Sequence, residues 1–158
     1  MFFLFFPLEK FLNCVIFKIR GVKMSRQYFS KDERAFYIKC GRYLGKNGVS
    51  AKVIYACEYQ TDSIIGALYF DYKDGEGFLR NINITNSNYL NRGVGTAMLK
   101  GFEKYMKKVG VTKIFGLYVP NGVGKPITPH FYENNGYHIE DEFICKDLDL
   151  EENNTRIL

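Results

Sequence analysis

The chain has 158 residues, about the length of one domain, and 46% of them are hydrophobic, so it can bury a single core without disulfide bonds. Aromatic residues make up 16% of the chain, which excludes a disordered protein. The formal net charge is +5, but residues 1–23 hold four Lys or Arg and one Glu, so only +2 remains for residues 24–158. That small excess argues against a nucleic-acid-binding domain.

The four cysteines are scattered, and the chain has only two histidines, His130 and His138. No C-x-x-C pair or His-rich segment is present, which argues against a zinc site, a redox motif or any other metal centre. Reduced thiols and a cytoplasmic location are expected. The cysteines are Cys14, Cys40, Cys57 and Cys145.

The N-terminal segment contains two apolar runs, residues 2–8 and 11–17, separated by Glu9 and Lys10. Neither run reaches the ~20 apolar residues of a membrane span, and the features of a signal peptide are missing. Three interpretations stay open: an extension upstream of a start at Met24, a first strand over residues 14–23, and, least favoured, an interfacial membrane anchor. We therefore divide the chain into an extension (1–23), one domain (24–150) and a tail (151–158).

A helix is predicted over residues 31–44. Ser30 and Glu33 have the spacing of a capping box, and Gly45 stands where the helix would stop. Four apolar residues between them recur at helical spacing: Phe36, Cys40, Tyr43 and Leu44.

The middle of the chain predicts an antiparallel meander with strands over residues 52–59, 63–72 and 78–85. Asp74-Gly75 is a hairpin signal between the last two strands. An amphipathic helix then runs from Val94 to Val109, with lysines in its last turn and Gly110 after it. A strand over 113–119, a short helix from Thr128-Pro129 to Asn135-Gly136 and a strand region over 137–147 follow.

A glycine-containing loop precedes the amphipathic helix. Gly93 and Gly95 let a ligand approach the backbone, and the free N–H groups of the helix start favour an anion. A P-loop would need a Lys-Ser or Lys-Thr that is missing, and a dinucleotide fingerprint would need a third glycine. A coenzyme A pyrophosphate loop and a plain glycine turn remain.

Two motifs resemble the GCN5-related N-acetyltransferase (GNAT) family. Residues 90–95 resemble its Q/R-x-x-G-x-G/A signature, with Leu90 in place of Gln or Arg, and residues 131–137 resemble its F-Y-E-x-x-G-F segment. The resemblance covers about residues 52–146. It implies an α+β fold with α/β/α layers, the acyl-CoA N-acyltransferase fold, whose mostly antiparallel sheet has splayed central strands flanked by helices.

The resemblance also implies a site. Acetyl-CoA would enter between strands 78–85 and 113–119, a backbone N–H near Ile84 or Thr85 would polarise its thioester, and Tyr132 would protonate the departing thiolate. Asn121 matches an Asn that often touches the coenzyme. Five successive residues would bind the pyrophosphate through their backbone: Arg92, Gly93, Val94, Gly95 and Thr96.

The general base is not evident, because the strand before the glycine loop offers Arg80, Asn81 and Asn83 rather than a carboxylate. Glu76, His130 and a water relay are the alternatives. The resemblance implies transfer of an acetyl group to the primary amine of a small molecule, a peptide N-terminus or a lysine. The acidic run 140–142 has two interpretations: a solvated face, which is favoured, and a region that attracts a cationic amine.

A non-catalytic module that binds coenzyme A or a protein partner is the second hypothesis. The acceptor is set in this family by the first helix region and by the loop before Tyr132. Homodimers are common in the family, so a dimer is also open.

Overall fold

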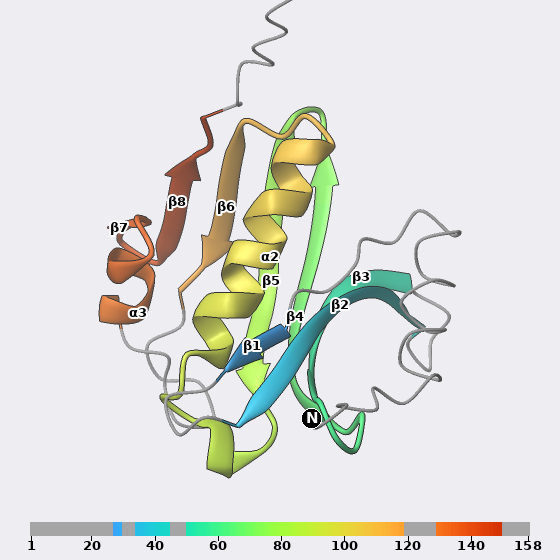
Figure 1. Cartoon of the computed structure of the whole chain (residues 1–158). Helices are drawn as coiled ribbons and strands as arrows, with labels where there is room; N and C mark the ends of the chain where they lie inside the picture. Colours follow the sequence, from blue (N-terminus) through green and yellow to red (C-terminus); the bar gives the residue numbers. More distant parts are fainter. Residues whose placement is uncertain (1–26, 30–33, 45–49, 119–128, 150–158) are drawn as a thin grey trace, which may run out of the picture.

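The computed structural model describes residues 27–29, 34–44, 50–118 and 129–149, which form one eight-stranded sheet with two helices (Figure 1). The N-terminal extension, Asn121 and the C-terminal tail lie outside these residues. The helices are α2 (Val94–Lys108) and α3 (Pro129–Asn134), and η1 (Ser87–Tyr89) is a single 3-10 turn. The strands are β1 (Gln27–Phe29), β2 (Ala35–Leu44), β3 (Ser50–Glu58), β4 (Ile64–Lys73), β5 (Glu76–Ile84), β6 (Lys113–Leu117), β7 (His138–Glu140) and β8 (Phe143–Asp147).

The strands lie in the order β1-β2-β3-β4-β5-β6-β8-β7. Every neighbouring pair is antiparallel except β5 and β6, which are parallel and joined through α2. A parallel pair requires such a crossover, whereas antiparallel neighbours can be joined by a hairpin. The predicted α+β fold with a mostly antiparallel sheet is confirmed.

The predicted helix over residues 31–44 is wrong, because residues 35–44 form strand β2. This strand pairs with β3 at every position from Phe36↔Glu58 to Leu44↔Ser50. Phe36 and Ile38 alternate with residues that face the other side of the sheet, and both are buried. The helical spacing of Phe36 and Cys40 also fits every second position of a strand, and nine cross-strand pairs outweigh the local helical signal.

The other predicted elements are present, with one refinement. Asp74 and Gly75 both have positive φ, 52° and 79°, as a tight β4–β5 hairpin requires. The region 137–147 is not one strand but a hairpin of β7 and β8, which turns at Asp141 with φ 52°. The acidic run 140–142 therefore lies at this turn.

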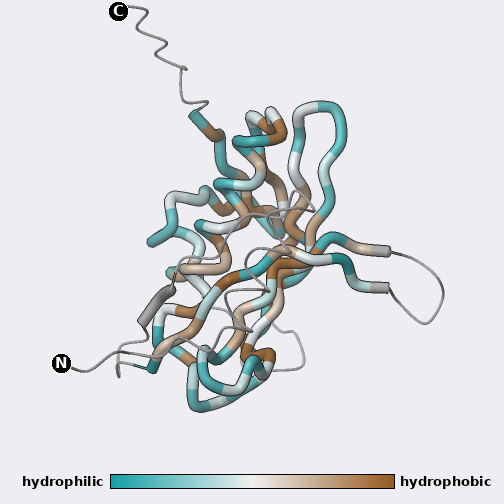
Figure 2. The backbone as a smooth tube through the Cα atoms, turned by 45° about the vertical axis from the view of Figure 1, so that its right-hand side comes forward, coloured by the Kyte–Doolittle hydropathy of each residue, from teal (hydrophilic) through white to brown (hydrophobic). Residues whose placement is uncertain are grey.

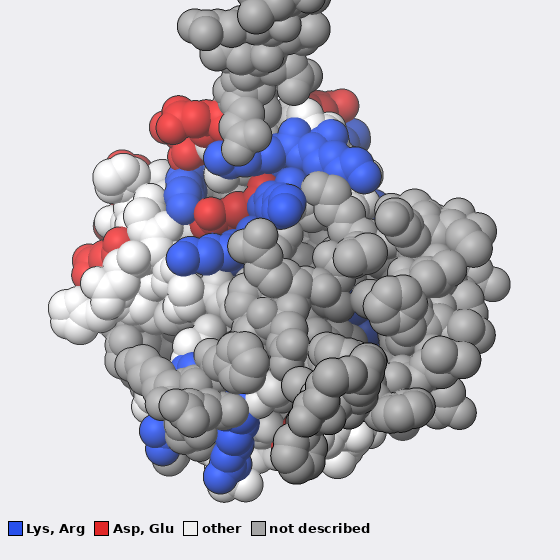
Figure 3. All heavy atoms as spheres, in the orientation of Figure 1, with Lys and Arg blue, Asp and Glu red and all other residues white. Residues whose placement is uncertain are grey.

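Helix α2 covers one face of the sheet and forms most of the core with it. Phe102 is fully buried, and its ring lies 5.1 Å from the ring of Phe70 on β4. On the outer side of the helix, lysines gather toward its C-terminal end, where they complement the helix dipole (Figure 3). Figure 2 shows the hydrophobic stretches toward the middle of the molecule and the hydrophilic ones at connecting turns.

A partly buried ion pair holds α3 and β8 against α2. The Nζ atom of Lys146 on β8 lies 2.9 Å from Oε1 of Glu103 on α2, and it also donates to the Asn135 carbonyl at 2.7 Å. The side chains of Lys146 and Glu103 are only 22% and 15% exposed. Because Asn135 directly follows α3, this cation fixes the end of that helix.

Both helices lie on the same side of the strands that they cover. Lys146 faces α2 and the end of α3, and Gly95 of α2 lies against Phe131 of α3. Every second side chain of β5, β6 and β8 points to the opposite side of the sheet. Within the described ranges neither helix covers that side. Among these residues no helix is long and apolar enough to cross a membrane.

Candidate active site

The central feature of the site is a gap between β5 and β6. Their parallel pairing begins at Glu76↔Lys113 and ends at Leu79↔Gly116. Beyond that point β5 continues with β4 as far as Ile84, while β6 follows β8. The β4–β5 register shifts beside this point, and such a bulge bends a strand. The predicted splaying of these two strands is therefore present.

One backbone N–H at the end of β5 faces the gap. The Thr85 N–H donates to the Ile65 carbonyl at 2.9 Å, so it belongs to the β4–β5 ladder and is not free for a ligand. Successive residues of an antiparallel strand direct their backbone groups to opposite sides. The Ile84 N–H therefore points away from β4, toward the gap, and of the two residues expected here Ile84 is the one that can bind a carbonyl.

The loop before α2 leaves the first N–H groups of the helix open. The first helical bond runs from the Ala97 N–H to the Gly93 carbonyl at 3.0 Å, so Val94, Gly95 and Thr96 have no acceptor within the helix. Among the described residues no side chain caps this end, and the first turn has no acidic residue. Arg92 is exposed in the same loop. This arrangement favours an anion.

The two glycines of the loop have different roles. Gly93 has φ 90°, a conformation that side chains rarely adopt, and the space where its Cβ would lie is open. A Cβ on Gly95 would instead come within 3.2 Å of the Phe131 ring. Gly93 therefore shapes the open loop, whereas Gly95 allows α3 to pack against α2. This contact also joins the two sequence motifs in space.

Tyr132 on α3 is buried in a cluster of aromatic rings. Its ring centre lies 5.9 Å from that of Tyr137, 6.3 Å from that of Tyr118 and 5.2 Å from that of Phe131. Burial, and then the neighbouring Tyr118, raise the pKa of Tyr132 to about 12. The hydroxyl is therefore protonated at neutral pH and is a hydrogen-bond donor.

The raised pKa of Tyr132 predicts a loss of stability in alkali. An unfolded tyrosine ionises near its ordinary value of 10.0, and folded Tyr132 near about 12, so ionisation favours the unfolded chain between these values. The free energy of unfolding should fall over this range, by up to roughly 3 kcal/mol from Tyr132 alone. Urea unfolding at pH 9 to 12 measures it. The Tyr132→Phe variant should lose stability less steeply, and equal pH slopes would contradict the assignment.

The side chains considered for a general base do not converge on the gap. His130 is 84% exposed, and its Nδ1 lies 3.2 Å from the Glu133 carboxylate. Glu76 begins β5, at the opposite end of the strand from Ile84. Arg80 binds Asp71 at 2.8 Å. On β5, in the part that lies beyond its pairing with β6, the side chains are Arg80, Asn81, Ile82, Asn83 and Ile84.

The sequence matches no protein-family model and no curated protein. Similar solved structures are nevertheless plentiful. An acetyltransferase of the GNAT family from Staphylococcus aureus is 15% identical, with a TM-score of 0.53 over 63% of this chain and 68% of that one. Tetrahymena GCN5 is 14% identical, with a TM-score of 0.51 over 65% and 71%. The PaiA N-acetyltransferase of Thermoplasma acidophilum, solved with coenzyme A, is 20% identical, with a TM-score of 0.51 over 90% and 72%.

The chain has the GNAT fold. This confirms the fold expected from residues 90–95 and 131–137. Sequence identities this low show the fold alone. In one respect the chain departs from the expectation. Residues 35–44, part of the first helix region that was expected to help set the acceptor, form strand β2 instead.

Proposed function

We propose that this GNAT-fold protein is an N-acetyltransferase that moves the acetyl group of acetyl-CoA to a primary amine by direct attack. The observation that carries the proposal is the gap between β5 and β6, because a strand edge, an anion-binding helix start and a buried tyrosine all belong to the elements around it. The free cysteines of the described residues support a reducing compartment such as the cytoplasm.

Each group has a role in this proposal. The N–H groups of Val94, Gly95 and Thr96 bind the pyrophosphate, and Arg92 adds positive charge. The Ile84 N–H polarises the thioester carbonyl as an oxyanion donor. The amine nitrogen forms a bond to the carbonyl carbon and the carbon–sulfur bond breaks. Tyr132 protonates the departing thiolate, while water carries away the proton of the amine.

A non-catalytic module that binds coenzyme A is the second candidate. One observation favours it: β5 has no carboxylate beside the gap to accept the amine proton. The same backbone groups would bind the coenzyme in both cases. Binding and transfer must therefore be measured separately.

Calorimetric titration of acetyl-CoA into the parent protein and two glycine variants tests the site. Gly93→Val closes the loop at the start of α2. Gly110→Val is a matched control, because Gly110 follows the other end of the same helix, has φ 82° and also has open space at its Cβ. Both variants force a side chain into a left-handed conformation, so both should lose similar stability, on the order of 1–2 kcal/mol.

We expect micromolar binding by the parent and by Gly110→Val, and at least tenfold weaker binding by Gly93→Val. Circular dichroism and thermal unfolding check that both variants are folded. A folded parent that binds no acetyl-CoA would overturn the proposal. Equal loss in both variants would place the effect in helix stability rather than in the loop.

A further inference from the structure

We propose that the face of β2, β3 and β4 opposite α2 is a docking surface for residues 1–17 of the same chain, which hold the two apolar runs 2–8 and 11–17. This docking concerns the assembly of the domain and does not depend on acetyl transfer. It would make the N-terminal segment a packed part of the domain.

The side chains of this face alternate with those of the core. Ile54 on β3 belongs to the core that α2 covers, so its neighbours Val53 and Tyr55 point to the other side. A Cβ on Gly41 of β2 would come within 3.8 Å of Val53 and 3.3 Å of Tyr55, which places Gly41 on that side too. We call this surface the tyrosine face. It consists of side chains from three neighbouring strands: Tyr37, Lys39, Gly41 and Tyr43 on β2, Ala51, Val53, Tyr55 and Cys57 on β3, and Ala67 and Tyr69 on β4.

The inner residues of the tyrosine face are buried although neither described helix lies over them. Val53 and Cys57 have 0% exposure and Ala67 has 4%. The core cluster that the described residues form beneath α2 includes none of the three. Burial is also the main cause that raises the pKa of Tyr37 and of Tyr55 on this face. Together these observations indicate a cover above the sheet.

The outer layer of the tyrosine face is aromatic. The rings of Tyr43 on β2 and Tyr69 on β4 lie 5.7 Å apart, so they meet above β3, which separates their strands. Tyr43 is nevertheless 45% exposed. A tyrosine ring offers a large apolar area with a single polar atom. A contiguous aromatic surface across three strands therefore suits an apolar partner.

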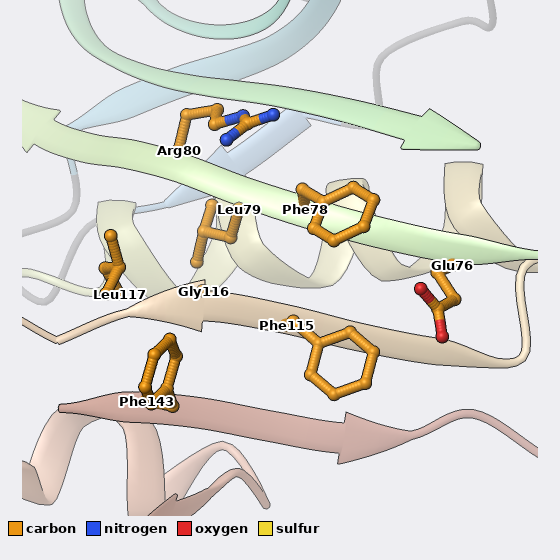
Figure 4. Close-up of a pocket in the computed structure, with 8 residues that line it drawn as sticks. All are labelled: Glu76, Phe78, Leu79, Arg80, Phe115, Gly116, Leu117 and Phe143. Carbon is orange, nitrogen blue, oxygen red and sulfur yellow. The ribbon is translucent and has the colours of Figure 1, made fainter. Parts of the chain in front are cut away.

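The tyrosine face is separate from the other apolar surface on this side of the sheet. Exposed asparagines on β5 end it, each paired with a residue of β4: Asn83 with Ala67 and Asn81 with Tyr69. Beyond them an apolar groove of about 420 Å³ lies over β5, β6 and β8 (Figure 4). Its walls Leu117 and Phe143 are 60% and 57% exposed. The groove is thus open, whereas the residues beneath the tyrosine face are covered.

The first described strand brings the chain to the tyrosine face. Gln27 on β1 pairs with Tyr37 at the edge of the sheet, and it lies ten positions after Phe17. Ten extended residues span up to roughly 33 Å. From β1 to β4 there are three strand spacings, roughly 14 Å. Both apolar runs can therefore reach every strand of the face.

The two runs also have a composition that requires burial. Neither is long enough to span a membrane, and an exposed surface of this kind promotes aggregation. Glu9 and Lys10 separate the runs and can stay in water while the runs pack. The runs hold six phenylalanines: Phe2, Phe3, Phe5, Phe6, Phe11 and Phe17. An aromatic face and an aromatic segment of the same chain thus match in chemistry and in reach.

A cross-link in the full-length protein tests the docking directly. Cys14 lies in the second apolar run. Tyr43→Cys adds a thiol at an exposed position of the tyrosine face, and Leu117→Cys adds one at an exposed position of the groove. Each variant is treated with a short bismaleimide, and mass spectrometry of the digested protein follows the peptides joined to Cys14. We expect Cys14 to join position 43 at least tenfold faster than position 117.

Three results of the cross-link would overturn the docking. Equal rates at positions 43 and 117 would mean that the segment is not held on the tyrosine face. A faster reaction at position 117 would place the segment in the groove. Links between two chains in place of links within one chain would assign the face to a second copy.

Alkylation of Cys57 by N-ethylmaleimide provides an independent measurement, because Cys57 has 0% exposure beneath the face. Phe17→Asp places a carboxylate in the second run, and Lys18→Asp places the same group one residue later, where the run has ended. We expect at least tenfold faster alkylation of Cys57 in Phe17→Asp and the parent rate in Lys18→Asp. Unchanged alkylation of Cys57 in Phe17→Asp would overturn the docking. Cys145 on β8 is the internal reference: if it accelerates equally, Phe17→Asp is unfolded and the cross-link decides.

Discussion

A Tyr132→Phe protein is expected to bind acetyl-CoA as tightly as the parent and to transfer the acetyl group at least a hundredfold more slowly. General acids contribute about 10²–10⁴-fold to a rate. Tyr132 fits this role because its pKa of about 12 keeps it protonated through neutral pH. The aromatic ring, which packs against three others, is retained in the variant.

Tyr137→Phe is the matched control for this prediction. Its ring lies 5.9 Å from the Tyr132 ring in the same cluster, and its buried hydroxyl makes no hydrogen bond within the described part of the chain. Loss of that hydroxyl should leave stability and transfer close to the parent values. Steady-state rates and calorimetry on both variants provide the comparison. A parent-like rate in Tyr132→Phe would mean that water supplies the proton and that Tyr132 only packs.

A Lys146→Met protein is expected to lose about 3 kcal/mol of stability, the cost of leaving one partner of a buried ion pair uncompensated. Glu103 would be left at 15% exposure without its cationic partner. The Asn135 carbonyl would lose its donor as well, so the end of α3 would loosen. Urea unfolding at neutral pH measures the loss.

Two comparisons sharpen the Lys146 prediction. Arg80→Met breaks an ion pair of similar length, 2.8 Å, whose side chains are 62% and 47% exposed. Because water screens such a pair, we expect a loss of at most about 1 kcal/mol. The double variant Lys146→Met/Glu103→Leu should regain much of the stability that the single variant loses. Equal losses in Lys146→Met and Arg80→Met would contradict the structural role of the buried pair.

The Lys146 pair also connects stability to the site, because it fixes the helix that carries Tyr132. If α3 loosens, Lys146→Met should lower the transfer rate even at temperatures where the protein stays folded. Binding of acetyl-CoA should change less, since the N–H groups of Val94, Gly95 and Thr96 belong to α2. The ratio of the two effects therefore reports on the position of Tyr132.

The sequence alone determined the elements that depend on local chemistry. Asp74-Gly75 produces its hairpin because both residues adopt positive φ, and Gly93 shapes the loop before α2 for the same reason. The periodic apolar residues of α2 fixed its buried side. The two motifs predicted the fold, which solved structures at 15% and 20% identity share.

Only the tertiary structure decided the features that depend on distant partners. Residues 35–44 form a strand because β3 supplies cross-strand partners that no local signal shows. Thr85 is unavailable to a ligand because Ile65, twenty positions earlier, accepts its N–H. An apolar groove arises where Phe78, Phe115 and Phe143 come together from three strands on one side of the sheet. A sequence records that such residues alternate, but packing decides which side of a sheet remains open to a ligand.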